Sequence, residues 1–369
     1  MKPLRVVRPG GLQGSRHEKW GWASSFHFCS DVLGMVKYFK AGGGTTMGKY
    51  KIFLFEDIHE EGKSILREKA DIFFAEKYDE DYLIDQVKDV DGIIIRANGK
   101  VSRRLMEAAP RLKVVGRHGV GVENIDTEAA TEKGISVVYT PEANTTSVAE
   151  HFFGLAIMLS KMLRKGERAF REEGRWEARY QYIGNELHGK TLGILGFGRI
   201  GKATGRIGHH GFDMKILYYD ALGFEEMEKE IGAVKVSLDE LLSQSDFISV
   251  NLPMLPATQG VLGAREFGLM KKTAYVINVA RGPIWDEKAL CFALKEGKIA
   301  GAGSDVYEVE PSSKDHPLLQ FENFIGTPHM AAHTEEALRR MSRVAVDILR
   351  VLDGKEPSYP VNRPERSNR

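Results

Sequence analysis

Four short motifs carry side chains that together could perform hydride-transfer chemistry on a 2-hydroxy acid. In chain order they read GFGRIG at residues 196–201, NVARGP at 278–283, DVYEVEP at 305–311 and TPH at 327–329. Each motif stands at the end of an apolar run that is typical of a buried strand. Any one of them is a weak signal alone, but the four in this order are difficult to explain as accidents of a packed core.

The last three motifs supply Arg281, Glu310 and His329 as the predicted catalytic residues. The planar guanidinium of Arg281 suits a bidentate grip on a substrate carboxylate, and its charge would polarise an adjacent keto oxygen. A hydroxy acid that loses hydride must also lose its hydroxyl proton, which the imidazole of His329 can accept at neutral pH. Glu310 would hold the tautomer of that imidazole. The alternative for each residue is a structural role: Arg281 in a surface ion pair, His329 at the entry of a helix and Glu310 as a solvated side chain. The occurrence of all three together favours the catalytic interpretation.

The glycine motif predicts a dinucleotide site, because it follows the apolar run at residues 191–195 and precedes a segment with helical character. Gly196 permits a tight turn, Gly198 lets the backbone approach a pyrophosphate, and Gly201 allows helix and strand to pack closely. Asp220 follows the next apolar run and is expected to accept hydrogen bonds from the adenosine ribose. Its charge would repel a 2′-phosphate, so the sequence predicts NAD rather than NADP. Otherwise the glycines only punctuate a turn and Asp220 is a solvated strand end.

Alternating helical and apolar segments predict an α/β fold of two domains, each a parallel sheet with flanking helices, with a doubly wound Rossmann-type cofactor domain. Residues 47–146 and 331–362 form the predicted substrate-binding domain, and residues 147–330 form the predicted NAD-binding domain. A capping box at residues 147–150 opens one helix that crosses between the domains, and a second such helix, a single one over residues 338–352, is expected to return the chain. Closure about these crossings would exclude water from the cleft.

From about residue 49 to about residue 362, the chain resembles the D-isomer-specific 2-hydroxyacid dehydrogenases, and the phosphoglycerate dehydrogenase branch in particular. Further family motifs are GRHGVGVENID at residues 116–126, TPEAN at 140–144 and ELHGK at 186–190. The resemblance implies that Arg281, Glu310 and His329 are the catalytic triad and that Asp305 bonds the nicotinamide amide. The predicted cofactor-binding set is completed by Arg199, Ile200, Pro253, Thr258 and Ala280. No metal is expected.

The predicted substrate-binding residues come from two loops of the first domain, and they are Arg96, Asn98, His118, Gly119, Val120 and Gly121. The family loop Arg-Ser-x-Thr-Lys reads RANGK here, and His118 stands where a small residue is common. Pro283 and Trp285 alter the usual glycine and valine after Arg281. These departures leave the substrate open. Arg96, Arg117 and Arg179 would suit a phosphate, and the alternative is that they are solvated surface arginines.

The expected activity is NAD-dependent interconversion of a D-2-hydroxy acid and its 2-keto acid, with D-3-phosphoglycerate and 3-phosphohydroxypyruvate as the leading pair, in serine biosynthesis. A glyoxylate or hydroxypyruvate reductase, or another D-2-hydroxyacid dehydrogenase, is the alternative among enzymes. An NADH-sensing binding protein that resembles the C-terminal binding protein corepressors is the alternative from another class. Formate dehydrogenases of this fold carry glutamine in place of Glu310, so Glu310 argues against that reaction.

Composition narrows the compartment and the partners. With 369 residues and a formal net charge of +1, the chain has no general basic field for nucleic acid, and no apolar run is long enough to span a bilayer. Cys29 and Cys291 cannot form a disulfide framework, which indicates a reducing cytoplasm. As a separate expectation, the protein is a homodimer. Residues 1–46 hold seven Lys or Arg against two Asp or Glu and are expected to be an unstructured leader. They are either a targeting peptide or, as we favour, sequence upstream of a start at Met47.

Overall fold

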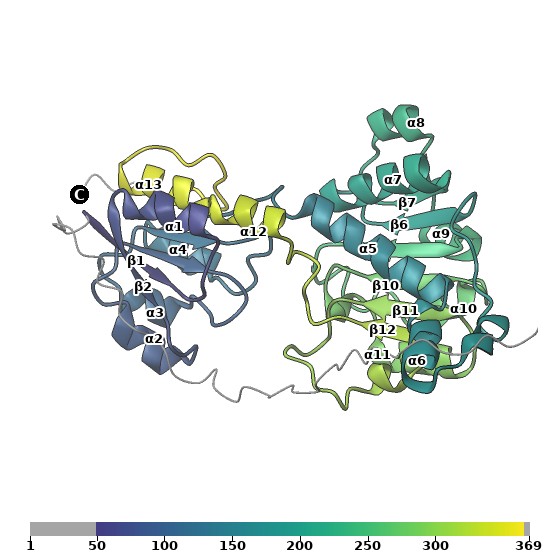
Figure 1. Ribbon diagram of the computed structural model, residues 1–369. Coiled ribbons are helices and arrows are strands. Elements are labelled where there is room, and N and C mark those ends of the chain that lie inside the picture. Colours follow the sequence, from purple (N-terminus) through teal and green to yellow (C-terminus); the bar gives the residue numbers. More distant parts are fainter. Residues whose placement is uncertain (1–48, 365–369) are drawn as a thin grey trace, which may run out of the picture. The chain divides into compact units, whose positions relative to one another are not determined.

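The computed structural model describes residues 49–364, which belong to one compact unit of the chain. The leader predicted at residues 1–46 lies outside the described residues. Within the described part, the chain forms two parallel sheets with helices packed on them (Figure 1). This arrangement confirms the predicted α/β fold class.

The first sheet lies between residues 50 and 138 and has the strand order β2-β1-β3-β4-β5, with every neighbouring pair parallel. Strand β3 is buried along its whole length, as parallel strands are when helices cover both faces. Helices α12 and α13 return from the far end of the chain, and α13 packs on α1 and β4. The elements are β1 (Tyr50–Leu54), α1 (Glu60–Arg67), β2 (Ala70–Phe74), α2 (Glu80–Gln86), β3 (Gly92–Ile95), α3 (Arg103–Glu107), β4 (Val114–Arg117), α4 (Thr127–Glu132), β5 (Ser136–Val138), α12 (Glu335–Ser342) and α13 (Val344–Leu352).

The second sheet lies between residues 191 and 326 and has the order β12-β11-β10-β9-β6-β7-β8, again with every neighbouring pair parallel. The order reverses between β6 and β9, which makes that point a topological switch. The strands are β6 (Thr191–Leu195), β7 (Lys215–Tyr219), β8 (Val234–Lys235), β9 (Phe247–Val250), β10 (Tyr275–Asn278), β11 (Gly301–Ser304) and β12 (Phe324–Gly326).

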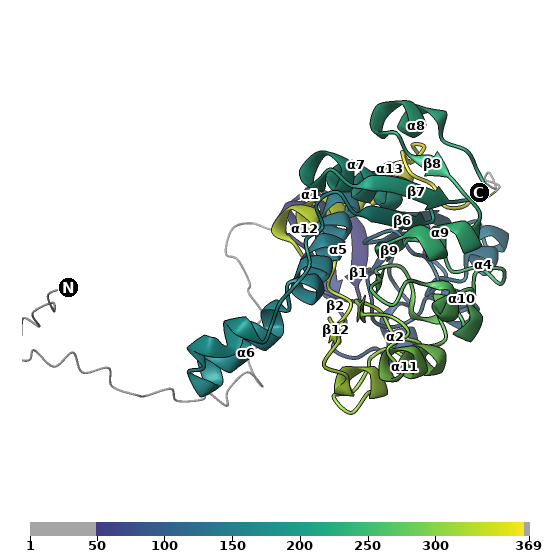
Figure 2. The same ribbon diagram turned by 90° about the vertical axis from the view of Figure 1, so that its right-hand side faces the viewer.

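Helix α5 (Thr145–Ser160) leads the chain into the second sheet, where it packs against α7, β10 and β11. The remaining helices of this part are α6 (Leu163–Glu173), α7 (Arg199–Phe212), α8 (Glu225–Ile231), α9 (Leu238–Gln244), α10 (Ala264–Leu269) and α11 (Glu287–Lys295), with short 3₁₀ turns η1 (Trp176–Tyr180), η2 (Gly282–Ile284) and η3 (Pro317–Gln320). Helix α6 projects away from the sheet (Figure 2).

The carboxyl ends of neighbouring strands carry the four motifs. Gly196 follows β6, Arg281 lies three residues after β10, Asp305 follows β11, and Thr327 follows β12. Because all these strands are parallel, their carboxyl ends meet at one edge of the sheet, next to the switch between β6 and β9. Residues that are far apart in the chain are therefore brought into one row.

The capping box predicted at residues 147–150 is wrong. Helix α5 begins at Thr145, its N-cap is Asn144, and no side chain of the described residues caps it. Ser147 lies inside the first turn, where its hydroxyl donates to the carbonyl oxygen of Ala331. The serine therefore ties the two chain crossings together rather than starting the helix.

The single helix predicted over residues 338–352 is two helices, α12 and α13, that break at Arg343. The hydroxyl of Ser342 donates to the carbonyl oxygen of Arg339, and its own carbonyl lies against Gly62 of α1, where a larger side chain would overlap it. A serine that bonds local backbone competes with the helical ladder. The apolar period continues through the break, so periodicity alone could not reveal it.

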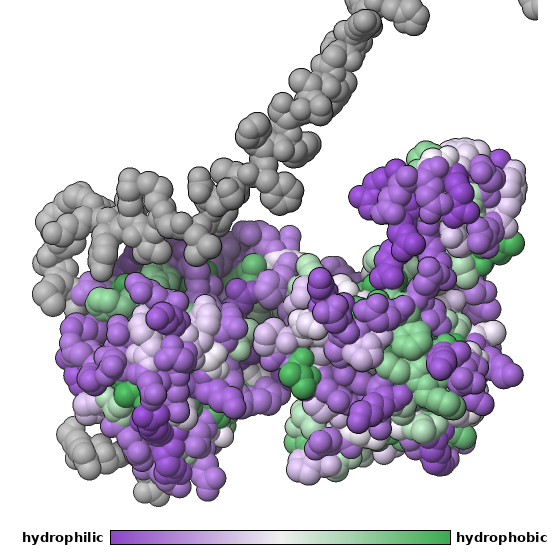
Figure 3. All heavy atoms as spheres, turned by 90° about the horizontal axis from the view of Figure 1, so that it is seen from below, coloured by the Kyte–Doolittle hydropathy of each residue, from purple (hydrophilic) through white to green (hydrophobic). Residues whose placement is uncertain are grey.

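The surface seen from below is mainly hydrophilic, with scattered hydrophobic patches (Figure 3). None of the helices within residues 49–364 combines the length and the apolar character needed to cross a membrane.

Candidate active site

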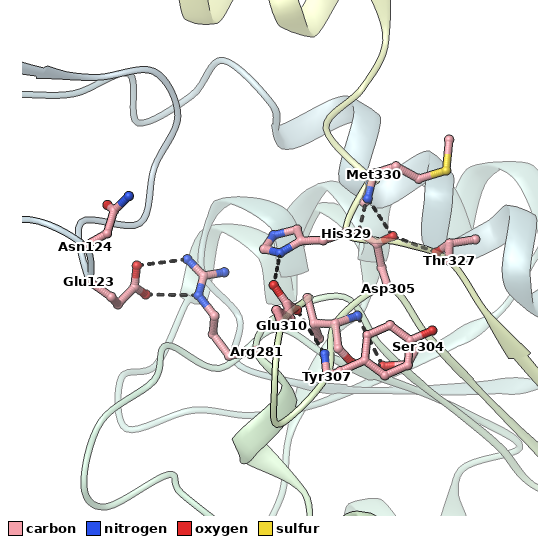
Figure 4. A network of polar contacts seen from close by, with 12 residues as sticks. Glu123, Asn124, Arg281, Ser304, Asp305, Tyr307, Glu310, Thr327, His329 and Met330 are labelled. Atoms are coloured by element: carbon pink, nitrogen blue, oxygen red, sulfur yellow. Dashed lines mark hydrogen bonds and ion pairs between the residues drawn. The ribbon is translucent and has the colours of Figure 1, made fainter. Parts of the chain in front are cut away.

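His329 and Glu310 form a direct pair at the carboxyl edge of the second sheet (Figure 4). The Nδ1 atom of His329 lies 2.7 Å from Oε2 of Glu310, and Oε1 of Glu310 accepts a hydrogen bond of 3.0 Å from the backbone N–H of Tyr307. Burial raises the pKa of Glu310, but the hydrogen bond and charge of His329 outweigh it, so the net pKa is below the ordinary value. An ionised carboxylate only accepts, so Nδ1 carries a proton and Nε2 remains to exchange one with a ligand.

The backbone of His329 adopts the left-handed region, with φ of 50°, which is uncommon for a residue other than glycine. Its N–H donates to the carbonyl oxygen of Asp305 at 2.8 Å. The Asp305 carboxylate accepts from the Thr327 hydroxyl at 2.6 Å and from the N–H groups of Met330 and Ala331, each at 2.8 Å. Asp305 is 1% exposed, so these hydrogen bonds are shielded from water. The turn that presents the imidazole is therefore held from both sides of His329.

His151 of α5 extends this network and was missed by the sequence analysis. Its Nε2 lies 2.9 Å from the Thr327 hydroxyl, which itself donates to Asp305, so Nε2–H is the donor of the first hydrogen bond. The available signal was a histidine in the first turns of an otherwise apolar helix. A helical pattern cannot tell which strand end such a side chain will meet.

Arg281 forms an ion pair with the carboxylate of Glu123, a residue of the same chain. Its Nε and Nη2 donate to Oε1 and Oε2 of Glu123 at 3.0 and 3.3 Å, and its Nη1 donates to the carbonyl oxygen of Ala280 at 2.7 Å (Figure 4). Burial raises the pKa of Glu123, but the charge and hydrogen bonds of Arg281 lower it by more. The net pKa is therefore below the ordinary value, and the carboxylate is stabilised in its ionised form. Glu123 stands within the quoted family motif at residues 116–126, but its partner was not predicted.

Close backbone packing brings Arg281 next to the histidine pair. Gly282 lies directly against the backbone of Tyr307 and Glu308, and any Cβ there would overlap both. The segment after β10 therefore lies on the segment between Asp305 and Glu310. The charge of Arg281 reaches Glu310 and contributes to lowering its pKa.

The glycine motif has the geometry that a dinucleotide needs. Gly196 has φ of 88°, and a Cβ on it would lie 2.8 Å from the backbone of Asn251 after β9, so this turn requires glycine. Gly198 has no heavy atom of another described residue near the position of its missing Cβ. No described side chain caps the first turn of α7, whose N–H groups are available to an anion. These residues fit the pyrophosphate of NAD.

Asp220 follows β7 and contacts the glycine motif. Its Oδ2 accepts from the N–H of Phe197 at 2.7 Å, and its Oδ1 accepts from the N–H of Leu222 at 3.0 Å. Each oxygen keeps a lone pair, so the carboxylate can still accept a hydrogen bond from a ribose hydroxyl. The proposed ribose contact therefore requires no rearrangement of the loop.

The other predicted cofactor residues lie near the same edge. Thr258 donates to the carbonyl oxygen of Pro253 at 2.6 Å in the loop after β9, and Ala280 is buried beyond β10. Arg199 and Ile200 begin α7, where Arg199 lies 3.4 Å from a carboxylate oxygen of Glu142.

Arg117 holds the loop that carries Gly119, Val120 and Gly121. Its Nη1 donates to the carbonyl oxygen of His118 at 2.8 Å, and its Nε donates to that of Gly121. Burial, followed by the charge of Arg281, lowers the pKa of Arg117 to about 10. Two donors of this guanidinium are therefore engaged by the loop, which supports a positioning role rather than a phosphate contact.

The remaining substrate candidates lie in different surroundings. Arg96 contacts the imidazole of His333, and Asn98 donates to Glu56 through both its backbone and its side-chain amide, each at 2.9 Å. His118 is 1% exposed, and neither of its ring nitrogens has a hydrogen-bond partner among residues 49–364. Burial, with Arg96 and Arg117, lowers the pKa of His118 to about 3.

Arg179, also suggested for a phosphate, stacks on the rings of Trp176 and Tyr180 in η1, with its guanidinium carbon 5.1 and 4.7 Å from their centroids. It contacts residues near α6 rather than the histidine pair. Its exposed aromatic neighbours point to another role for this segment.

Comparison with known proteins shows the family of this chain. Residues 153–331 match the model of the D-isomer specific 2-hydroxyacid dehydrogenase NAD binding domain. The chain is 42% identical over 316 residues to a D-3-phosphoglycerate dehydrogenase of Methanocaldococcus jannaschii, a match that covers 85% of this chain and 60% of that protein. It is 38% identical over 321 residues to a glyoxylate reductase of Korarchaeum cryptofilum, covering 85% of this chain and 96% of that protein.

Among solved structures, a glyoxylate reductase from Paecilomyes thermophila superposes with a TM-score of 0.76 at 31% identity, over 85% of this chain and 99% of that one. The similarity therefore extends through both sheets, whereas the chain spans only about 60% of the Methanocaldococcus protein.

Proposed function

Because the chain belongs to the D-isomer-specific 2-hydroxyacid dehydrogenase family, we propose that it interconverts a D-2-hydroxy acid and its 2-keto acid with NAD as the cofactor. The observation that carries this proposal is the 2.7 Å pair between His329 and Glu310, with Arg281 beside it, at the strand ends that also carry the glycine motif. An NADH-sensing binding protein would need the glycine motif but not this pair.

In the proposed reaction, bound NADH supplies the hydride, and NAD⁺ accepts it in the reverse direction. Arg281 binds the substrate carboxylate, and its charge polarises the neighbouring keto group so that the carbonyl carbon accepts hydride more readily. His329 delivers a proton from Nε2 to that oxygen as it becomes a hydroxyl, while Glu310 stabilises the imidazole through Nδ1. In the oxidative direction, the same nitrogen receives the hydroxyl proton.

For the substrate, we propose the pair D-3-phosphoglycerate and 3-phosphohydroxypyruvate, a reaction of serine biosynthesis in the cytoplasm. Arg96 supports this proposal, because it is half-buried and its contact is a histidine rather than a carboxylate. Burial and the charge of Arg96 lower the pKa of His333, so this imidazole stays neutral and adds no second positive charge beside the guanidinium. Glyoxylate or hydroxypyruvate is the second candidate, favoured by the similarity to glyoxylate reductases over nearly their whole length.

Steady-state kinetics with phosphorylated and unphosphorylated 2-keto acids tests this proposal, with NADH absorbance as the signal. Replacing Arg96 with alanine should raise KM for 3-phosphohydroxypyruvate about tenfold or more and leave KM for glyoxylate nearly unchanged, because a charged hydrogen bond to a distal anion is lost. Arg104→Ala is the matched control, since Arg104 is an exposed arginine of α3 paired with Asp81. An equal effect of Arg96→Ala on both substrates would favour the reductase. NADH binding without turnover of any 2-keto acid would favour the binding protein.

We also propose that the protein is a homodimer that pairs through the segment around α6. Phe170, Trp176 and Tyr180 are 56%, 62% and 70% exposed, although aromatic side chains of this size are usually covered. Helix α6 projects from the sheet (Figure 2), and the exposure of the three rings leaves them accessible to a second copy. Sedimentation velocity should give twice the chain mass, and a monomer at micromolar concentration would contradict the proposal.

A further inference from the structure

Glu123 occupies the position that the proposed reaction assigns to the substrate carboxylate. It meets Arg281 through both carboxylate oxygens, at 3.0 and 3.3 Å, which is the bidentate arrangement that an arginine offers to a carboxylate ligand (Figure 4). The Nη1 atom of Arg281 donates to Ala280. Among the described residues, Nε and Nη2 have no partner other than Glu123. Glu123 therefore fills the edge formed by Nε and Nη2.

The surroundings of the pair are those of the predicted substrate site. Both side chains lie against Gly121, and a Cβ at position 121 would overlap Nη2 of Arg281 and Oε2 of Glu123. Gly121 belongs to the loop held by Arg117, and Arg281 stands beside the Glu310 carboxylate that partners His329. The glutamate therefore lies where a loop backbone, a guanidinium and an imidazole pair come together.

The pair is exposed enough to exchange. The side chains of Arg281 and Glu123 are 32% and 54% exposed, and no other described side chain forms an ion pair or hydrogen bond with the Glu123 carboxylate. An ion pair at this exposure contributes at most about 1 kcal/mol, since solvent competes for both charges. A carboxylate ligand that also reaches His329 can displace it, and the released glutamate returns to water.

We propose that Glu123 is a resident carboxylate that occupies Arg281 in the free enzyme and is displaced by the carboxylate of the substrate. Arg281 then keeps an anionic partner before and after binding, and a ligand without a carboxylate cannot exchange with Glu123 at equal charge. Glu123 thereby lowers the affinity for all ligands and favours those with a carboxylate. It acts through Arg281 and is a positioning and specificity residue. This inference rests on the proposed function for the identity of the ligand.

The test is Glu123→Gln, which keeps the size of the side chain and removes the competing charge. We expect KM for the 2-keto acid to fall about two- to fivefold, the upper factor corresponding to about 1 kcal/mol. The inhibition constant of the 2-hydroxy acid product should fall by the same factor, because both ligands displace the same carboxylate. Glu107→Gln is the matched control. Glu107 lies at the end of α3, is equally exposed at 54%, and forms an ion pair of 3.4 Å with Lys133. It should change neither constant.

The opposite split overturns the inference. If Glu123 instead holds Arg281 in its working orientation, Glu123→Gln will raise KM and lower kcat. If the pair is merely structural, only the unfolding midpoint will move. Glu123→Asp gives a second reading, because its shorter side chain keeps the charge but withdraws the carboxylate, and it should also lower KM.

A binding measurement separates this inference from the proposed function. Calorimetry with oxamate, a carboxylate that cannot be reduced, in the presence of NADH reports occupancy of Arg281 without turnover. Tighter oxamate binding to Glu123→Gln than to the parent protein supports the displacement even if every 2-keto acid tested is inert. Equal or weaker binding contradicts it, whatever the activity.

Discussion

The two groups that would act on the substrate are held in very different ways. The turn that carries His329 is tied to Asp305, a carboxylate with 1% exposure that accepts three hydrogen bonds, and the network continues to His151 of α5. Arg281 is held by one half-exposed ion pair to Glu123 and by one hydrogen bond to Ala280. The proton-transfer group is therefore fixed in advance, whereas the carboxylate-binding group is held by a contact that a ligand can replace.

This difference matches the demands of the two roles. Proton transfer requires the imidazole within hydrogen-bond reach of the reacting oxygen, and a strained backbone such as that of His329 persists only when its surroundings over-determine it. A binding group must be desolvated only when the ligand arrives, so a replaceable partner serves it better. Three substitutions test this difference between the two groups.

The largest effect is expected at the fixed side, from His329→Ala. Without the imidazole, the keto oxygen loses its proton donor, and kcat should fall by about 10² to 10⁴, the usual contribution of general acid catalysis. Steady-state NADH oxidation measures it, with the unfolding midpoint as a check of folding. Turnover within a factor of about three of the parent enzyme would remove His329 from the mechanism.

Asp305→Asn tests whether the buried network sets the position of His329. The amide nitrogen must face at least one of the hydroxyl and N–H donors that now meet the carboxylate, so one buried donor loses its acceptor. We expect the free energy of unfolding to fall by about 3 kcal/mol and kcat to fall with it. Urea denaturation gives the first quantity. Asp239→Asn, which disturbs only the exposed ion pair with Arg265, should cost less than about 1 kcal/mol. Equal losses in the two variants would contradict the account.

A smaller effect is expected from His118→Phe, and it appears only as a change in pH dependence. Burial, Arg96 and Arg117 lower the pKa of His118 to about 3, so the folded chain keeps it neutral while the unfolded chain protonates it near its ordinary value. The unfolded state then binds more protons, and stability falls as the pH falls from about 7 to about 5, by about 2 kcal/mol from this residue. In His118→Phe, this part of the pH dependence of the free energy of unfolding should disappear.

Urea unfolding of the parent chain and His118→Phe at both pH values makes the comparison, and the other histidines contribute equally to each. The same pH sensitivity in the two chains would mean that His118 is accessible to protons in the folded state. His118 would then resemble Arg281, whose contact a ligand can replace, rather than the fixed turn of His329.

The sequence predicted the strand ends that carry the candidate residues better than the contacts that hold those residues in place. The apolar runs at 191–195 and 215–219 are β6 and β7. Arg281 and His329 lie past the ends of β10 and β12, as expected from the strand pattern. Glu123 could not be found in this way, because it lies in a loop whose side-chain directions no period encodes. The same holds for the Asp305 network, since its members join three separate segments.

Local patterns misled at two serines whose hydroxyls bond backbone carbonyls, one in another segment of the chain and one in its own helix. Ser147 has the spacing of a capping residue but donates to Ala331, and Ser342 ends α12 within an unbroken apolar period. The sequence does not show that the carbonyl of Ala331 lies near Ser147, and it does not show that Ser342 bonds the carbonyl three residues before it instead of facing solvent. These two helix boundaries could therefore not be predicted from local pattern.

The most direct test of the central claim is a crystal structure of the protein with NADH and oxamate. The account predicts the oxamate carboxylate on Nε and Nη2 of Arg281, its carbonyl oxygen within hydrogen-bond distance of Nε2 of His329, and Glu123 turned away from the guanidinium. An oxamate bound elsewhere, with Glu123 still paired to Arg281 beside a bound NADH, would contradict both the chemistry and the displacement.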